Sequence, residues 1–133
     1  MKSKLLLAVA LAAALHLFAK TIDEIVVKVN AVSRLRSELD PRRWRGEPIA
    51  MGTNTDPYQR AEGKYHLTRG IVEVLTELAN PFSVLTKSTL VLRDLDILAP
   101  MARENLVRVM ISLTTLDRGL ARIMEPRAPT PER

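Results

Sequence analysis

Two periods of apolar residues alternate along the chain and predict helices and strands in turn. A period near 3.6 predicts a helix over 67–78, because Leu67, Ile71, Leu75 and Leu78 recur at helical spacing. A period of two predicts a strand over 107–113, where valine, isoleucine and leucine occupy every second position and point to one face. Asn80 and Pro81 follow the helix, and we expect Asn80 to be its left-handed cap residue.

The same reasoning places the remaining elements. Strands are predicted over 25–29, 48–53 and 82–87, the second of them buried. Helices are predicted over 31–39, from about Thr89 through Ala102, and over 117–124. Pro41 should end the first helix, Pro100 should kink or shorten the second, and the prolines from Pro126 onward should end regular structure. No internal repeat is evident.

Strands that alternate with helices favour the α/β class, with a parallel sheet and right-handed crossover helices. Three or four strands are too few to close an eight-stranded barrel. They are also too few to cover both faces of an open sheet well. The chain is therefore either a small open sheet or part of a larger structure, and its ending at Thr130–Arg133 favours the second interpretation.

The first twenty residues differ in character from the rest. Lys2 and Lys4 precede an apolar run over 5–19, which is typical of a secretory signal and is too short to span a membrane. An N-terminal helix packed on the domain, or a leader produced by an altered reading frame, explains the same pattern. We therefore divide the chain into residues 1–20, the leader or N-terminal helix, and residues 21–133, the α/β domain.

Composition narrows the chemistry. The chain has 133 residues, a formal net charge of +5 and no cysteine, so it has no disulfide, no thiolate nucleophile and no cysteine-ligated zinc or iron–sulfur site of its own. Its two histidines are too few to build a metal site alone. The basic residues are scattered rather than clustered, which favours an ordinary solvated surface over a nucleic-acid interface. Aromatic residues make up 4% of the chain, so Trp44, Tyr58, Tyr65 and Phe82 are better explained by core packing than by base stacking.

Candidate binding residues follow the ends of three predicted strands. In parallel α/β proteins these ends meet at one edge of the sheet, where ligands bind. The three loops are 52–59, 86–89 and 112–115, and their hydroxyl, amide, carboxylate and ammonium groups suit a ribose, carboxylate or phosphate. Ordinary turn and capping roles remain open for these residues. Lys87 either extends into solvent or binds a carboxylate. Asp56 lacks a nearby histidine, cysteine or second carboxylate, so catalysis by it as a general base has little support.

These loops also carry a family resemblance. The segments 47–59, 67–69, 80–88, 93–96, 112–117 and 125–127 together resemble the radical S-adenosylmethionine proteins related to spore photoproduct lyase. The resemblance covers about residues 25–133. It implies a (β/α) barrel, of which this chain is a part, with a [4Fe–4S] cluster held by a CxxxCxxC loop and S-adenosylmethionine bound at its open iron. It also implies cleavage of S-adenosylmethionine to a 5′-deoxyadenosyl radical, a cytoplasmic location and, in the lyase branch, a thymine lesion in DNA as substrate.

The resemblance further implies roles for individual residues. Gly52, Thr53, Asn54 and Thr55 would lie by the methionine part of the cofactor, Lys87 would meet its carboxylate and Ser112 its ribose. Asp56 and Thr114 belong to the same loops and complete the predicted cofactor-binding set. No residue is assigned as catalytic or as a metal ligand.

The sequence departs from that family in one decisive respect. Where the family carries its cysteine loop, ahead of the run at Ile25, this chain has the apolar leader. We therefore expect the chain to be inactive alone, either as a fragment or as one half of a barrel completed by a second polypeptide. The alternative is a non-enzymatic α/β binding or structural module exported through residues 1–20, and a basic nucleic-acid binder is a third hypothesis.

Overall fold

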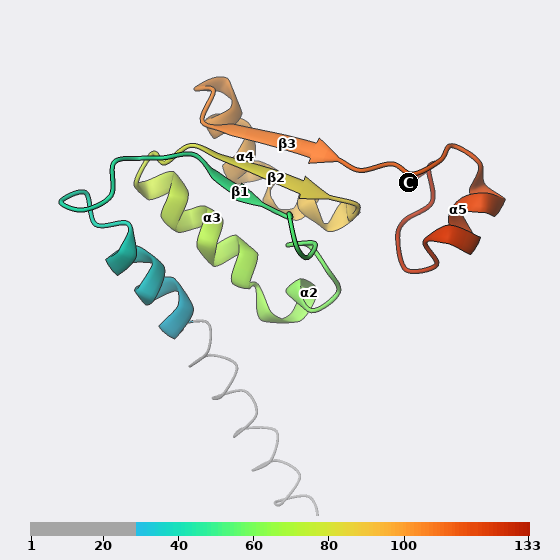
Figure 1. Ribbon diagram of the computed structural model, residues 1–133, viewed down its shortest axis with the longest axis horizontal. Coiled ribbons are helices and arrows are strands. Elements are labelled where there is room, and N and C mark those ends of the chain that lie inside the picture. The colour runs from blue at the N-terminus through green and yellow to red at the C-terminus, as the bar shows by residue number, and fades with distance from the viewer. Residues whose placement is uncertain (1–28) are drawn as a thin grey trace, which may run out of the picture.

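The computed structural model describes residues 29–133 (Figure 1). Its first element is a helix over residues 29–38, which ends shortly before Pro41, so the predicted first helix is confirmed. Val29 lies in this helix and not in the strand predicted over 25–29. The rest of that strand and the leader over 1–20 lie outside the described residues.

Three parallel strands form the sheet. They are β1 (Ile49–Met51), β2 (Phe82–Thr86) and β3 (Val107–Ile111), and they lie side by side in the order β1-β2-β3. The register aligns Ile49 with Phe82 and Phe82 with Val107. The predicted α/β class with parallel strands and intervening helices is confirmed.

The helices fall between and after the strands. They are α2 (Glu62–Tyr65), α3 (Leu67–Glu77), the 3-10 helix η1 (Thr89–Asp94), α4 (Leu95–Arg103) and α5 (Arg118–Met124). Side-chain caps begin two of them: the Ser88 hydroxyl accepts from the Leu90 amide at 3.2 Å, and the Asp117 carboxylate accepts from the Leu120 amide at 2.7 Å. The prediction that α5 ends before Pro126 is confirmed.

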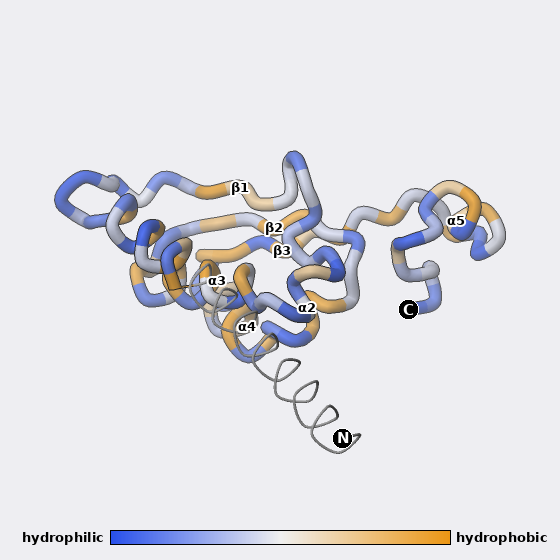
Figure 2. Tube along the Cα trace, turned by 90° about the horizontal axis from the view of Figure 1, so that it is seen from below, coloured by the Kyte–Doolittle hydropathy of each residue, from blue (hydrophilic) through white to orange (hydrophobic). Residues whose placement is uncertain are grey.

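The core lies between one face of the sheet and the helices α3 and α4, which occupy the same side of the strands in Figure 2. Phe82 and Val84 of β2 point to this face and are buried. They share a cluster with residues of both helices: Val72, Val74 and Leu75 from α3, and Leu98 and Met101 from α4. The opposite face carries Leu85 and Met110, which are 37% and 39% exposed, so within residues 29–133 only one face of the sheet is covered.

Three expectations need correction. The left-handed residue after α3 is Ala79, with φ of 47°, while Asn80 is buried with its side chain accepting a hydrogen bond from Trp44 Nε1 at 2.6 Å. The strand β1 is partly exposed, because among the described residues it has a neighbour on one side only. Pro100 does not shorten α4, which continues to Arg103 because Leu98 and Met101 anchor it in the core.

The alternation predicted for β3 also differs from the structure. Val109 and Ile111 share the helix-facing side of the pleat with Val84 and Thr86, but they are 38% and 60% exposed. Among the described residues β3 is an edge strand, and the helices reach only its first half. The alternation in β3 therefore shows which side chains share a face, but it does not show whether that face is buried.

Candidate functional site

The three predicted loops meet at the carboxyl edge of the sheet. Gly52, Lys87 and Ser112 are each the first residue after a strand, following β1, β2 and β3 in turn. Because the strands are parallel and adjacent, their ends bring the loops to one edge. The predicted placement of the three loops is confirmed, while their ligand remains a prediction.

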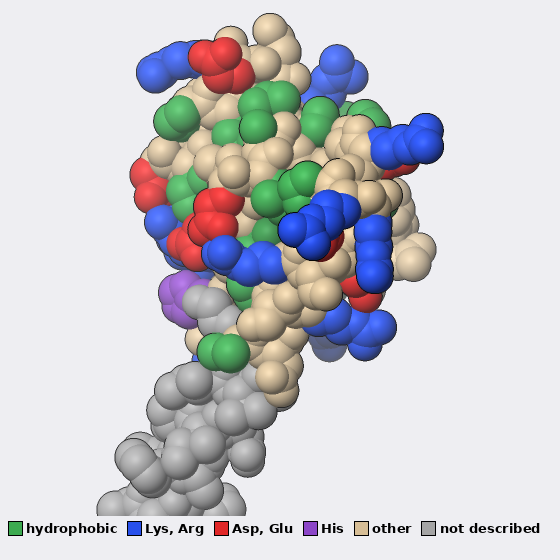
Figure 3. Space-filling model, turned by 90° about the vertical axis from the view of Figure 1, so that its left-hand side faces the viewer, with side chains coloured by type: hydrophobic (Ala, Val, Ile, Leu, Met, Phe, Trp, Pro, Cys, Tyr) green, Lys and Arg blue, Asp and Glu red, His purple; other side chains and the backbone are tan. Residues whose placement is uncertain are grey.

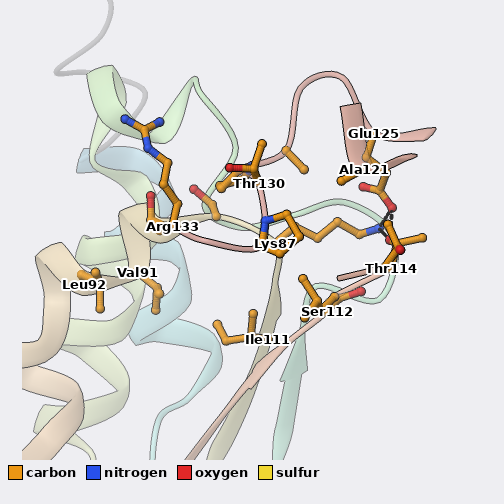
Figure 4. Close-up of a pocket in the computed structure, with 17 residues that line it drawn as sticks. Lys87, Val91, Leu92, Ile111, Ser112, Thr114, Ala121, Glu125, Thr130 and Arg133 are labelled. Atoms are coloured by element: carbon orange, nitrogen blue, oxygen red, sulfur yellow. Dashed lines mark hydrogen bonds and ion pairs between the residues drawn. The ribbon is translucent and has the colours of Figure 1, made fainter. Parts of the chain in front are cut away.

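A cavity of about 280 Å³ lies at this edge, between the ends of β2 and β3 and the chain that follows α5 (Figure 4). Lys87, Ser112 and Thr114 line it, together with Val91 and Ile111 at its apolar base. The last residues of the chain form its other wall: Ala128, Pro129, Thr130, Pro131 and Arg133. The cavity therefore combines an apolar base with a few convergent polar groups, which is typical of a small-molecule site.

One carboxylate faces the polar groups of this cavity. The Lys87 ammonium and the Thr114 hydroxyl both donate to Oε1 of Glu125, and Lys87 Nζ lies 3.4 Å from Thr114 Oγ1. The Lys87 ammonium, followed by the Thr114 hydroxyl, lowers the pKa of Glu125 below its ordinary value. Sequence reasoning missed Glu125 as a site residue, because it lies 38 positions beyond Lys87 and its only signal was its place in the resembling segment 125–127.

The residues of the first loop line a different cavity. Gly52, Thr53, Asn54, Thr55 and Asp56 face a space of about 570 Å³, which is closed on the other side by α2 and the start of α3. Asp56 is the exception, since it also lines a third cavity with Lys87 and Glu125. The structure therefore divides the eight predicted residues between two cavities that share no lining residue among those described, and the third cavity shares Asp56 with one of them and Lys87 and Glu125 with the other.

Asp56 braces the loop after β1 against the end of β2. Its Oδ1 accepts hydrogen bonds from the Thr86 hydroxyl at 2.6 Å and the Tyr58 amide at 2.8 Å, and its Oδ2 accepts one from the Lys87 amide at 2.8 Å. Both carboxylate oxygens are therefore used by the protein itself. This arrangement positions the backbone of Lys87 and gives Asp56 a structural role in place of that of a general base.

A buried charge network lies beneath the same loops and was not predicted. Asp94 is fully buried and accepts hydrogen bonds from Tyr58 Oη at 3.0 Å, from Arg69 Nη1 at 3.1 Å and from Arg93 Nε at 2.7 Å. Arg93 also pairs with buried Glu62 at 2.7 Å. The network connects Tyr58 of the first loop with α2, α3 and η1.

Burial alone would raise the pKa of both acids. For Asp94, the hydrogen bonds from Arg93, Tyr58 and Arg69 outweigh burial and lower the pKa. For Glu62, the hydrogen bonds from the Thr68 amide and from Arg93 outweigh burial and lower the pKa. Burial raises the pKa of Tyr58, and Asp94 raises it further. The two acids are therefore held ionised in the folded protein.

This arrangement predicts acid destabilisation. Because the folded-state pKa values are depressed, the unfolded chain binds protons at a higher pH than the folded protein does. The network's contribution to the free energy of unfolding is therefore complete above about pH 4.5 and is lost as the pH falls through the folded-state pKa values. We expect the midpoint of urea denaturation to be constant from pH 7 to 5 and to fall steeply below pH 4. The Asp94→Asn variant should show a shallower fall over the same range, and an equal slope in both proteins would contradict this origin.

Other predicted features are placed as follows. Tyr58 and Phe82 are buried in the core, and Trp44 donates a hydrogen bond to Asn80, which agrees with the predicted packing role of these aromatic residues. Tyr65 differs, since it is 40% exposed.

Within residues 29–133, no group of three or more His, Asp or Glu side chains is placed to hold a metal ion. None of the helices in that part of the chain is long and apolar enough to cross a membrane. On the face in Figure 3, acidic and basic side chains are interspersed.

Comparison with known proteins gives relatives of undescribed activity. A Mycobacterium tuberculosis protein is 48% identical over 109 residues, which are 82% of this chain and 32% of the relative. An Acidianus two-tailed virus protein is 35% identical over 91 residues, which are 68% of this chain and 29% of the relative. A Methanocaldococcus jannaschii protein is 29% identical over 109 residues, which are 82% of this chain and 39% of the relative. All three are described as uncharacterized proteins. The chain thus spans about a third of the length of these relatives, and no family model or solved structure matches it.

Proposed function

We propose that this chain is part of a (β/α) barrel of the radical S-adenosylmethionine class related to spore photoproduct lyase, and that its carboxyl-edge loops bind the carboxylate end of S-adenosylmethionine. The observation that carries the proposal is the meeting of Lys87, Ser112 and Thr114 in one cavity at the ends of adjacent parallel strands. An ammonium beside hydroxyl donors is the chemistry that recognises a carboxylate.

The winding of the sheet supports a barrel. Consecutive strands are neighbours in the order β1-β2-β3, and α3 and α4 lie on the same face. In a doubly wound sheet the strand order reverses and helices cover both faces, whereas in a barrel all helices lie outside and the inner face packs on other strands. The uncovered face with Leu85 and Met110 corresponds to that inner face. The greater length of the relatives accords with further strands.

The iron–sulfur cluster of this class does not fit the residues of this chain. The cluster is held by three thiolates, and the chain contains no cysteine. We therefore assign no step of radical chemistry to these residues. Their proposed contribution is to bind and orient the cofactor, and the cluster ligands and the remaining strands of the barrel would lie outside these residues.

Each loop would contribute differently to cofactor binding. Lys87 would pair with the carboxylate, and the Asp56 brace on its backbone amide would hold it at the edge. Ser112 is fixed by the hydrogen bond from its amide to the Thr86 carbonyl at 2.9 Å, which leaves its hydroxyl to meet a ribose. Gly52, Thr53, Asn54 and Thr55 line the separate cavity at the end of β1 and would lie by the methionine part.

Binding of S-adenosylmethionine to the full chain, measured by calorimetry, tests the proposal. We expect Lys87→Met to weaken binding at least tenfold, because it removes a charge-assisted hydrogen bond worth about 1.5–3 kcal/mol. Decarboxylated S-adenosylmethionine should bind Lys87→Met and the unmodified protein equally. The matched control is Arg103→Met, which removes one exposed cation at the far end of α4.

Two results would contradict the proposal. Equal weakening by Lys87→Met and Arg103→Met would mean that the loss does not come from a carboxylate contact at Lys87. Absence of any binding to the unmodified chain would contradict the proposed function and favour the alternative of a non-enzymatic α/β module.

A further inference from the structure

We propose that Glu125 is an internal competitor for this site: its carboxylate occupies the position at Lys87 and Thr114 that a ligand carboxylate would take, and it must leave before a ligand binds. The inference rests on the proposed function and adds a regulatory contact to the same site. It assigns the segment after α5 the role of a displaceable cover.

The contacts carry the first step of the argument. The Lys87 ammonium and the Thr114 hydroxyl converge on a single oxygen of Glu125 (Figure 4). A carboxylate ligand would use the same two hydrogen-bond donors, an ammonium and a hydroxyl. A ligand and Glu125 therefore require the same two donors at the same place.

The attachment of Glu125 carries the second step. Glu125 directly follows α5, which has seven residues, none of them buried. Its apolar residues Leu120, Ile123 and Met124 are 45%, 79% and 55% exposed. A helix of this length is marginal in water without tertiary packing. Figure 1 shows α5 standing apart from the sheet and the other helices. Displacing Glu125 would therefore disturb no part of the core.

The cavity wall carries the third step. Beyond Glu125 the chain turns back over the cavity, and Ala128, Thr130 and Arg133 line its outer side. The segment that supplies the competing carboxylate thus also narrows the entrance. Release of Glu125 would free a carboxylate position and widen the opening in a single movement.

The test compares Glu125→Gln and Glu125→Ala with the unmodified chain and with Glu104→Gln. The control removes one exposed carboxylate at the end of α4. Calorimetry with methionine and with S-adenosylmethionine measures affinity, and hydrogen exchange of the amides over 118–125 measures release of the cover. We expect both Glu125 variants to bind each ligand up to about fivefold more tightly, as befits loss of a single partly exposed ion pair. Ligand should also speed exchange over 118–125 in the unmodified chain.

The possible results separate this inference from the proposed function. Equal affinity of all four proteins for S-adenosylmethionine would overturn competition by Glu125 and leave the cofactor site intact. Tighter methionine binding by the Glu125 variants, with no binding of S-adenosylmethionine by any protein, would support the competing carboxylate and refute the proposed cofactor. Absence of binding by both ligands would overturn both proposals.

Discussion

Replacing Gly52 by alanine is expected to lower the free energy of unfolding by at least about 3 kcal/mol. Gly52 has φ of +98°, which side chains rarely adopt, and a Cβ built on it would lie 2.1 Å from the carbonyl oxygen of Leu85. That oxygen belongs to the backbone of the central strand, so it cannot move without breaking the sheet. Chemical denaturation followed by circular dichroism measures the loss.

Gly46 provides the matched control for this substitution. It also has a positive φ, +78°, but a Cβ there would meet no atom within 4 Å. Gly46→Ala should therefore show only the backbone strain, about 1–2 kcal/mol. Equal losses in the two variants would mean that the close approach at Leu85 does not determine the loop. A larger loss at Gly52 would show that this glycine is needed for the fold, whatever ligand the loop binds.

Replacing Asp94 by asparagine is expected to cost about 3–5 kcal/mol, because it removes one partner from a buried ion pair. Arg93 would lose its charged acceptor while remaining paired with Glu62, and the buried Tyr58 hydroxyl would lose its carboxylate acceptor. Thermal and urea denaturation at pH 7 measure the effect. The near-isosteric change keeps the volume of the site, so packing contributes little to the loss.

Asp96 provides the control that tests whether burial of the carboxylate determines the loss of stability. It pairs with the same arginine, Arg69, at 2.8 Å, but its side chain is 59% exposed. Asp96→Asn should therefore have a much smaller effect than Asp94→Asn. Similar losses in both variants would indicate that Arg69, and not the buried position of Asp94, holds this region together.

These two predictions bear on the site because both positions support its loops. Gly52 allows the first loop to pass close to β2, and Asp94 ties Tyr58 of the first loop to Arg69 of α3. Neither needs to touch a ligand. A loss of binding in either variant is therefore interpretable only beside its measured stability, whereas Lys87→Met and the Glu125 variants change groups at the protein surface.

Local pattern was sufficient for much of the fold. Helical periodicity located α3, alternation located β3, and loops of Gly, Asn, Asp, Ser and Thr located the three strand ends. These signals rest on the geometry of one element, which is encoded within a few neighbouring residues. The left-handed cap shows the limit, since Ala79 rather than Asn80 takes that conformation, and Asn80 instead serves a distant contact with Trp44.

The candidate site was predictable as a location but not as an arrangement. That Lys87 and Ser112 share one edge follows from parallel strands, which the order of elements already implied. The pairing of Lys87 with Glu125, 38 residues apart, depends on the path of the chain beyond β3. The use of both Asp56 oxygens within the protein likewise depends on how two loops approach each other.

The sequence by itself therefore determined the α/β class, the order of the three strands with helices between them and the polar character of the carboxyl edge, because periodicity and turn chemistry act over a few residues. Only the tertiary structure decided which face of the sheet is covered, that Asp94 is buried with two arginines, and that Glu125 meets Lys87. Burial and ion pairing between distant residues are set by the packing of whole elements, and no local pattern specifies them.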